Sequence, residues 1–152
     1  MNDGFQAHVA AQHARLGEFI AVLERERAIL ADTPVAIDTL SDITEAKRAL
    51  AADLERMEAR RQQLVAAHGH PTDAAGAAAL AERLGCTALW QTFIARVDDA
   101  RTHNRLNGLH IDTRLDHARR TLGFLRQASA QNLYAADGQR AAPAGRRFSG
   151  GA

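Results

Sequence analysis

The sequence predicts an all-α protein, an elongated antiparallel bundle of three long helices with a disordered C-terminal tail; one short extra helix is a variant of this fold. The composition favours helix over strand, because Ala and Leu abound while only one Trp, one Tyr and five Phe occur. Apolar residues also recur every three or four positions over long segments. A chain of 152 residues suffices for one core. We therefore expect a helical domain over residues 1–128 and a flexible tail over residues 129–152.

The first helix is expected over about residues 5–31. Val9, Leu16, Leu23 and Leu30 follow one another at a spacing of seven residues, and Phe19 and Ile20 broaden this line. Such a stripe is typical of the core-facing side of an amphipathic helix.

The second helix is expected over about residues 34–67, with Thr33 as its N-cap and Pro34 as its first residue. Its apolar positions advance by alternating steps of three and four, as in a coiled-coil seam. The seam comprises Leu40, Ile43, Lys47, Leu50, Leu54, Met57, Arg61 and Leu64. For Lys47 and Arg61, we expect the stems to lie along the apolar surface with the charges in water.

A short Ala-rich helix is expected over residues 73–84, closed by Gly85. The longest helix should then run over about residues 87–127, on the order of 60 Å at 1.5 Å per residue. Beyond Ser129 the chain has few apolar residues and is expected to be disordered. One face of the long helix is predicted to carry Trp90, Phe93, Ile94, Val97, Arg101, Asn104, Gly108, Ile111, Leu115, Ala118, Leu122 and Leu125.

Further apolar residues of this helix, namely Leu106, Leu109 and Phe124, point roughly away from that face. Either the short helix covers part of them, or they await a binding partner. Gly108 within a helix costs about 1 kcal/mol relative to Ala. This glycine is either simply tolerated, or it allows close approach of another backbone to which Asn104 and Asn107 offer hydrogen bonds. The sequence alone does not favour one alternative over the other.

Catalytic and metal-binding signatures are sparse. The sequence has no HExxH, GxGxxG, P-loop, GxSxG or CxxC motif. His103, His110 and His117 lie about 10 Å apart along a helix, too far to share one ion. His68 and His70 with Asp73 would form only a weak site. His110 followed by Arg114 leaves a histidine phosphotransfer module as a distant alternative. We expect no catalysis, no metal and no cofactor.

Bulk properties exclude other classes. The net charge of +1 does not favour nucleic-acid binding. The single Cys86 excludes an intramolecular disulfide and fits a reducing compartment. We find neither a signal peptide nor an apolar segment long enough for membrane insertion. A soluble cytoplasmic protein is expected.

Three segments resemble the FlgN family of flagellar export chaperones. They are Glu45-Ala-Lys-Arg-Ala-Leu50, Asn104-Arg-Leu-Asn-Gly108 and Leu133-Tyr-Ala-Ala-Asp-Gly138. The helical layout is compatible over about residues 8–138, and the specific motifs lie in the last third. The last two segments, at this separation, are much more specific together than either is alone.

The resemblance implies a cytoplasmic chaperone that holds the terminal helices of hook-associated proteins, prevents their early assembly and delivers them to the flagellar type III export gate. It places cargo binding between residues 104 and 125, and docking to the cytoplasmic domain of the export-gate membrane protein in the tail. Export ATPase components are further partners that it implies. The residues concerned are Asn104, Asn107, Gly108, Leu109, Ile111, Leu115, Leu122 and Leu125 for cargo, and Leu133, Tyr134, Asp137 and Gly138 for the gate.

Two positions depart from the family pattern. Ala135 stands where Gly is frequent, and His110 stands where apolar residues are frequent, so the contact set can differ here. The remaining alternative is a structural protein whose apolar faces pair in a homodimer.

Overall fold

In a computed structural model, which describes residues 3–149, the chain folds into four helices, and the described residues contain no strand. The helices are α1 (Asp3–Ala31), α2 (Ile37–Ala67), α3 (Ala74–Arg83) and α4 (Thr87–Ser149). The all-α prediction is confirmed. The count of three helices is wrong, because the described residues form four. The fourth is the short extra helix that the sequence allowed as a variant, and it is present as α3.

The chain divides into two compact units, residues 1–110 and residues 111–152. The first unit contains α1, α2, α3 and the first part of α4, and it holds the hydrophobic core. The described part of the second unit, residues 111–149, is helical throughout.

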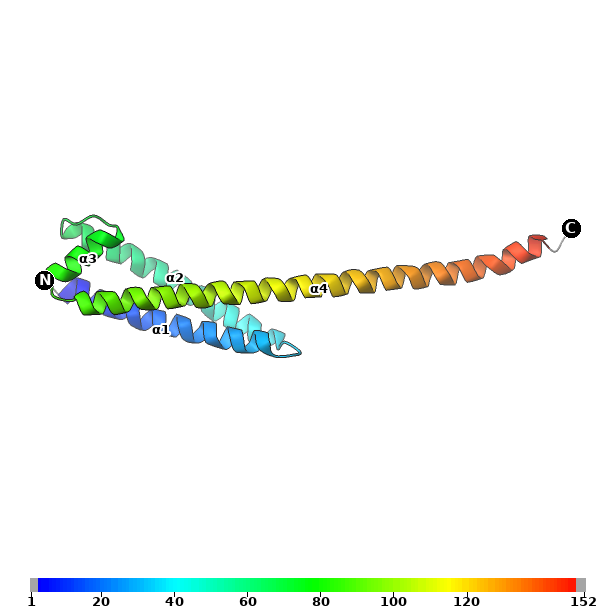
Figure 1. Cartoon of the computed structure of the whole chain (residues 1–152), viewed down its shortest axis with the longest axis horizontal. Helices are drawn as coiled ribbons and strands as arrows, with labels where there is room; N and C mark the ends of the chain where they lie inside the picture. Colours follow the sequence, from blue (N-terminus) through cyan, green and yellow to red (C-terminus); the bar gives the residue numbers. More distant parts are fainter. Residues whose placement is uncertain (1–2, 150–152) are drawn as a thin grey trace. The chain divides into compact units, whose positions relative to one another are not determined.

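Helices α1 and α2 form an antiparallel hairpin, which Figure 1 shows in blue and cyan. The predicted stripe of α1 is confirmed, since Val9, Leu16, Leu23 and Leu30 are all buried. Polar contacts also cross the hairpin: His8 Nε2 donates to the Met57 carbonyl at 2.7 Å. The pattern of spacing seven therefore gave the correct buried face of this helix.

The start of α2 differs from the prediction. The helix begins at Ile37, and its N-cap is Ala36, which has extended backbone and makes no side-chain cap. The peptide bond between Thr33 and Pro34 is cis. Residues 32–36 instead form the loop that connects the two antiparallel helices. Connections between neighbouring helices of a bundle are commonly this short.

Helix α3 begins where the capping residues predicted. The Asp73 carboxylate accepts a hydrogen bond from the backbone N–H of Gly76 at 2.8 Å. Gly76 is required by close packing, because a Cβ there would lie 1.8 Å from the Pro71 carbonyl oxygen. Gly85 follows the helix with φ of +72°, the left-handed conformation that favours glycine after a helix end.

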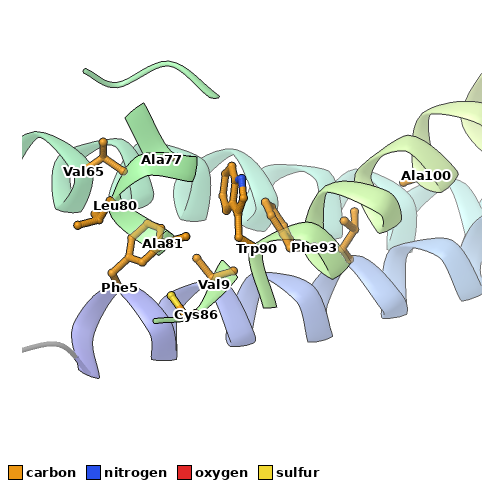
Figure 2. Close-up of a cluster of buried hydrophobic side chains, with 11 residues drawn as sticks. Phe5, Val9, Val65, Ala77, Leu80, Ala81, Cys86, Trp90, Phe93 and Ala100 are labelled. Carbon is orange, nitrogen blue, oxygen red and sulfur yellow. The ribbon is translucent and has the colours of Figure 1, made fainter. Parts of the chain in front are cut away.

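The core lies where α3 meets α1, α2 and the beginning of α4, as Figure 2 shows. Trp90 is its centre: its ring centroid lies 6.3 Å from that of Phe5 and 5.5 Å from that of Phe93. Helix α3 contributes Ala77, Leu80 and Ala81 to this cluster. It does not cover Leu106, which stays 40% exposed, so that reading of Leu106 is wrong.

Helix α4 continues to Ser149, well beyond the predicted end near Gln127. The segment after Gln127 is rich in Ala, Gln and Arg, which have high helix propensity, and Pro143 comes late in it. A low apolar content was therefore a poor indicator of where this helix ends. Within residues 3–149, we find no helical stretch apolar and long enough to cross a bilayer.

Candidate functional site

The first part of α4 packs on the bundle through a face different from the predicted one. Ala100 and Asn107 are buried and His103 is half-buried, whereas the predicted Arg101 and Asn104 are exposed. The buried positions follow Phe93 at a spacing of seven. The predicted face continued from Ile94 and Val97 to Arg101 and Asn104. After Val97 it therefore lies one residue away from the positions that are buried.

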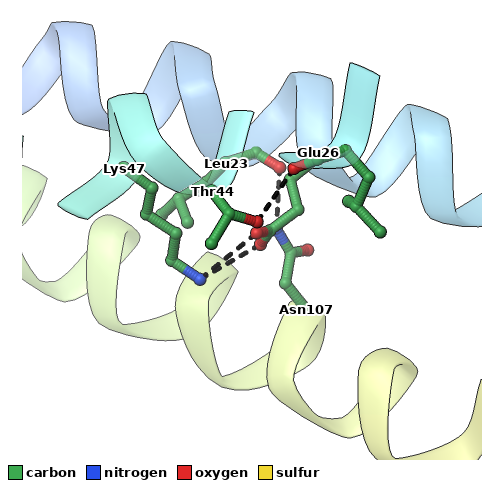
Figure 3. A network of polar contacts seen from close by, with 6 residues as sticks. Leu23, Glu26, Thr44, Lys47 and Asn107 are labelled. Carbon is green, nitrogen blue, oxygen red and sulfur yellow. Dashed lines mark hydrogen bonds and ion pairs between the residues drawn. The ribbon is translucent and has the colours of Figure 1, made fainter. Parts of the chain in front are cut away.

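Asn107 lies at the centre of a buried polar network, shown in Figure 3. Its Nδ2 donates to the Leu23 carbonyl at 2.7 Å and to Glu26 Oε1 at 3.0 Å. Glu26 is only 2% exposed, and Lys47 Nζ donates to the same carboxylate at 3.2 Å. The network thus ties α4 to both helices of the hairpin.

This placement changes the interpretation of Asn107, which the sequence assigned to cargo. The side chain is 1% exposed and its amide hydrogens are used inside the bundle. Its Oδ1 has no hydrogen-bond partner. In the chain as folded here, Asn107 positions α4 on α1 rather than offering an amide at the surface.

Contrary to expectation, Lys47 and Arg61 do not simply extend their charges into water, because each charge pairs with a carboxylate. Lys47 pairs with Glu26, as above. Arg61 is buried, donates through Nε to Glu58 Oε2 at 3.1 Å, and forms a second hydrogen bond through Nη2 to Glu58 Oε1. Its guanidinium also lies over the Trp90 ring, 5.0 Å from the centroid. Each seam cation therefore has a specific acidic partner.

A further polar contact joins α1 and α4. Arg96 Nη1 donates to the His13 carbonyl at 3.3 Å and lies 3.5 Å from His13 Nδ1. Burial, and secondly the Arg96 charge, lower the pKa of His13 below its usual 6.5. The sequence analysis did not predict these contacts between helices. The signal that could have indicated them is that two polar residues, Gln12 and Glu26, occupy positions of α1 at which the periodicity expects apolar residues.

On the outside of α4, the first unit exposes apolar side chains. Leu106 and Leu109 are 40% and 57% exposed, and Asn104 is exposed beside them. A Cβ at Gly108 would meet no atom within 4 Å. Packing within the chain therefore does not require Gly108, and both readings stay open: simple tolerance of the glycine, or close approach of another backbone.

The second unit, described by itself, continues α4 from Ile111. Ile111 is half-buried and Leu125 is 53% exposed. The side chains of the other predicted residues in this unit, Leu115, Leu122, Leu133, Tyr134, Asp137 and Gly138, lie outside those that the structure describes. Their assignments stay predictions.

Two histidines and Cys86 of the described region have defined surroundings. No group of three or more His, Cys, Asp or Glu side chains in that region could hold a metal ion. His68 Nδ1 bonds the Leu64 carbonyl at 2.8 Å, and His70 Nε2 lies 3.4 Å from Arg83 Nη1. Burial raises the pKa of the Cys86 thiol, which disfavours the reactive thiolate.

Comparison with known proteins gives two matches. The family model described as FlgN protein matches residues 1–142. The flagella synthesis protein FlgN of Proteus mirabilis is 28% identical over 139 residues, which cover 90% of this chain and 91% of that protein. No solved structure matches.

Proposed function

The chain belongs to the FlgN family, and from this premise we propose that it is a cytoplasmic, non-catalytic export chaperone of flagellar assembly. It binds the terminal helices of hook-associated proteins, keeps them from assembling early and delivers them to the type III export gate. The name of the Proteus mirabilis relative, a flagella synthesis protein, supports the flagellar role.

The observation that carries cargo binding is the exposure of large apolar side chains on α4. Leu109 is 57% exposed in the first unit and Leu125 is 53% exposed in the second. Burying such a side chain contributes roughly 1.5–3 kcal/mol, of which folding of this chain leaves about half unused. Binding of an amphipathic helix would recover it.

The neighbouring residues suit a helical cargo. Gly108 has open space where a side chain would be, so a cargo backbone can approach α4 closely there. Asn104 is exposed and can both donate to and accept from that backbone. Asn107 and Glu26 hold the same turn of α4 on α1 from behind. In the second unit, Ile111, Leu115, Leu122 and Leu125 are proposed to bind cargo as well.

The segment Leu133–Gly138 is proposed to dock the cytoplasmic domain of the export-gate membrane protein. Its support is the Leu-Tyr-x-x-Asp-Gly pattern, with Tyr134 as the aromatic anchor and Asp137 and Gly138 completing it. Aromatic residues are frequent anchors of binding energy at protein interfaces. Separating the cargo surface from the docking segment allows both partners to be held together, with the export ATPase components as further partners.

Cargo binding is tested by titrating the full chain with a terminal helical segment of a hook-associated protein. We expect a stoichiometric complex that Leu109→Glu and Leu125→Glu each weaken roughly tenfold or more, because a charge would enter an apolar contact. Ile37→Glu is the matched control, since Ile37 is an apolar residue of α2 with 75% exposure. Equal binding by all variants with unchanged circular dichroism would remove α4 as the cargo surface.

The docking segment is tested separately with Tyr134→Ala. We expect this variant to retain cargo binding and to lose binding to the purified cytoplasmic domain of the export gate. Retention of both interactions would show that Tyr134 has no docking role.

A further inference from the structure

A groove lies between α2 and α4 in the first unit, well before the proposed cargo surface. Its central hollow has a volume of about 470 Å³ and an apolar floor that includes Trp90, Phe93, Ile94 and Val97. A neighbouring hollow of about 650 Å³ shares Glu58 and Arg101 with it and adds Phe19 and Leu54. We call these two adjoining hollows together the α2–α4 groove. Its size and apolar floor suit helix side chains.

The charges along this groove are predominantly acidic. Glu55 and Asp98 line it and are exposed, and Asp73 lies at its α3 end. The guanidinium of Arg61 is held against Glu58 and Trp90, so it does not balance these carboxylates. Arg101 remains as the basic residue of the rim. The groove therefore favours an apolar helix with basic flanks.

The same chain carries a segment of that description. Residues 111–152 contain seven Arg against three Asp, a net charge of +4, whereas residues 1–110 contain twelve Lys and Arg against fifteen Asp and Glu, a net charge of −3. In residues 111–126, apolar residues recur at steps of three and four, from Ile111 to Leu125. Arg119 and Arg126 each follow a leucine of this repeat by four residues, which places them beside the seam of a helix.

We propose that the α2–α4 groove of one copy binds residues 111–126 of a second copy, and that the exchange is reciprocal. Each copy has one acidic groove and one basic helical segment, so a two-fold pair forms the same interface twice and closes on itself. Flanking charges of opposite sign select the partner and its orientation, as at the flanking positions of a coiled coil. This inference rests on the groove and on the charges rather than on cargo binding, but residues 111–125 also belong to the proposed cargo surface, so cargo and a second copy would compete for them.

Sedimentation of the full chain over a wide range of concentrations tests the proposal. We expect a monomer–dimer equilibrium that shifts toward monomer as salt rises, because exposed charges are screened. The double variant Glu55→Lys with Asp98→Lys should dimerise roughly tenfold or more weakly, since each flanking contact changes from attraction to repulsion. No hydrogen bond or ion pair of the described structure is assigned to either side chain, so the fold should persist by circular dichroism.

Two further samples make the test specific. Glu24→Lys with Asp42→Lys changes the charge equally at exposed positions outside the groove and should leave dimerisation close to that of the unmodified chain. Arg119→Glu with Arg126→Glu should dimerise weakly alone but form a mixed dimer with the groove variant, in which one interface is the unmodified one and the other is restored with its charges exchanged. A chain that stays monomeric, a dimer insensitive to the groove variant, or failure of the mixture to associate would each overturn the proposal. Cargo titration of the groove variant, whose substitutions lie outside residues 104–125, reports separately on the proposed function.

Discussion

The two ends of the interface between α4 and the hairpin are built differently. Around Trp90 and Phe93, α4 packs in an apolar cluster with Phe5, and α3 closes the cluster. Around Asn107, the same helix is held by hydrogen bonds to Glu26 and the Leu23 carbonyl. Packing therefore anchors one end, whereas polar pairing defines the register of the other.

This difference has an energetic consequence. Apolar burial contributes to stability at about 25 cal/mol per Å², whereas a buried ion pair gains little net because both groups are desolvated. The polar end also contains buried atoms without a partner, His103 Nδ1 and Asn107 Oδ1. We expect the Trp90 end to carry most of the stability, and the Asn107 end to specify one alignment next to the proposed cargo surface.

The largest effect is expected from Trp90→Ala. Truncation of a buried Trp removes its contacts with Phe5, Phe93 and Arg61 and should lower the free energy of unfolding by about 3–5 kcal/mol. Urea denaturation measures this, with Gln91→Ala at the adjacent exposed position as the control. A loss below that of an ordinary surface substitution would contradict the apolar anchor.

An intermediate effect is expected from Lys47→Met. It leaves the Glu26 carboxylate buried without its cation, which should cost about 2–3 kcal/mol, below the full range for buried pairs because Lys47 is partly exposed. Adding Glu26→Leu should recover part of this loss, since no buried charge then remains unpaired, although one amide hydrogen of Asn107 loses its acceptor. If the double variant is as unstable as the sum of the single variants, the network is more than a pairing of charges.

The smallest effect is expected from pH. The pKa of His13 is lowered in the folded chain, so the unfolded chain binds this proton first as pH falls below about 6.5. The contribution of His13 to stability is therefore complete above that pH and is lost as pH falls toward the folded-state pKa. His13→Gln should remove this part of the slope in urea melts between neutral and mildly acid pH. An unchanged slope would contradict the burial of His13 beside Arg96.

The sequence predicts the helices and their buried faces well where apolar residues occupy the core. The stripe of α1 from Val9 to Leu30 is confirmed because hydrophobic periodicity alone determines which side is buried. It fails where polar residues enter the core. Asn107 is buried because it bonds Glu26 on another helix, and Arg61 is buried where it pairs with Glu58 of its own helix and lies over Trp90 of α4. The spacing of apolar residues along one helix does not reveal these contacts with other helices.

The candidate surface was predicted in part. The angular position of Leu109 predicted that it points away from the packed face, and it is exposed. The short helix α3 packs in the core around Trp90 and does not cover Leu106. Asn107 was expected at the surface but is buried, because the buried face of α4 is shifted by one residue from the predicted face. In a helix, one residue corresponds to a rotation of about 100°, enough to exchange a surface position for a buried one.

The central claim is that α4 presents the cargo surface while the α1–α2 hairpin supports it. Hydrogen–deuterium exchange of the full chain, with and without a saturating terminal helical segment of a hook-associated protein, tests this most directly. We predict new amide protection over residues 104–125 and little change in residues 5–30. Protection confined to α1 and α2, or none despite saturation, would contradict the claim.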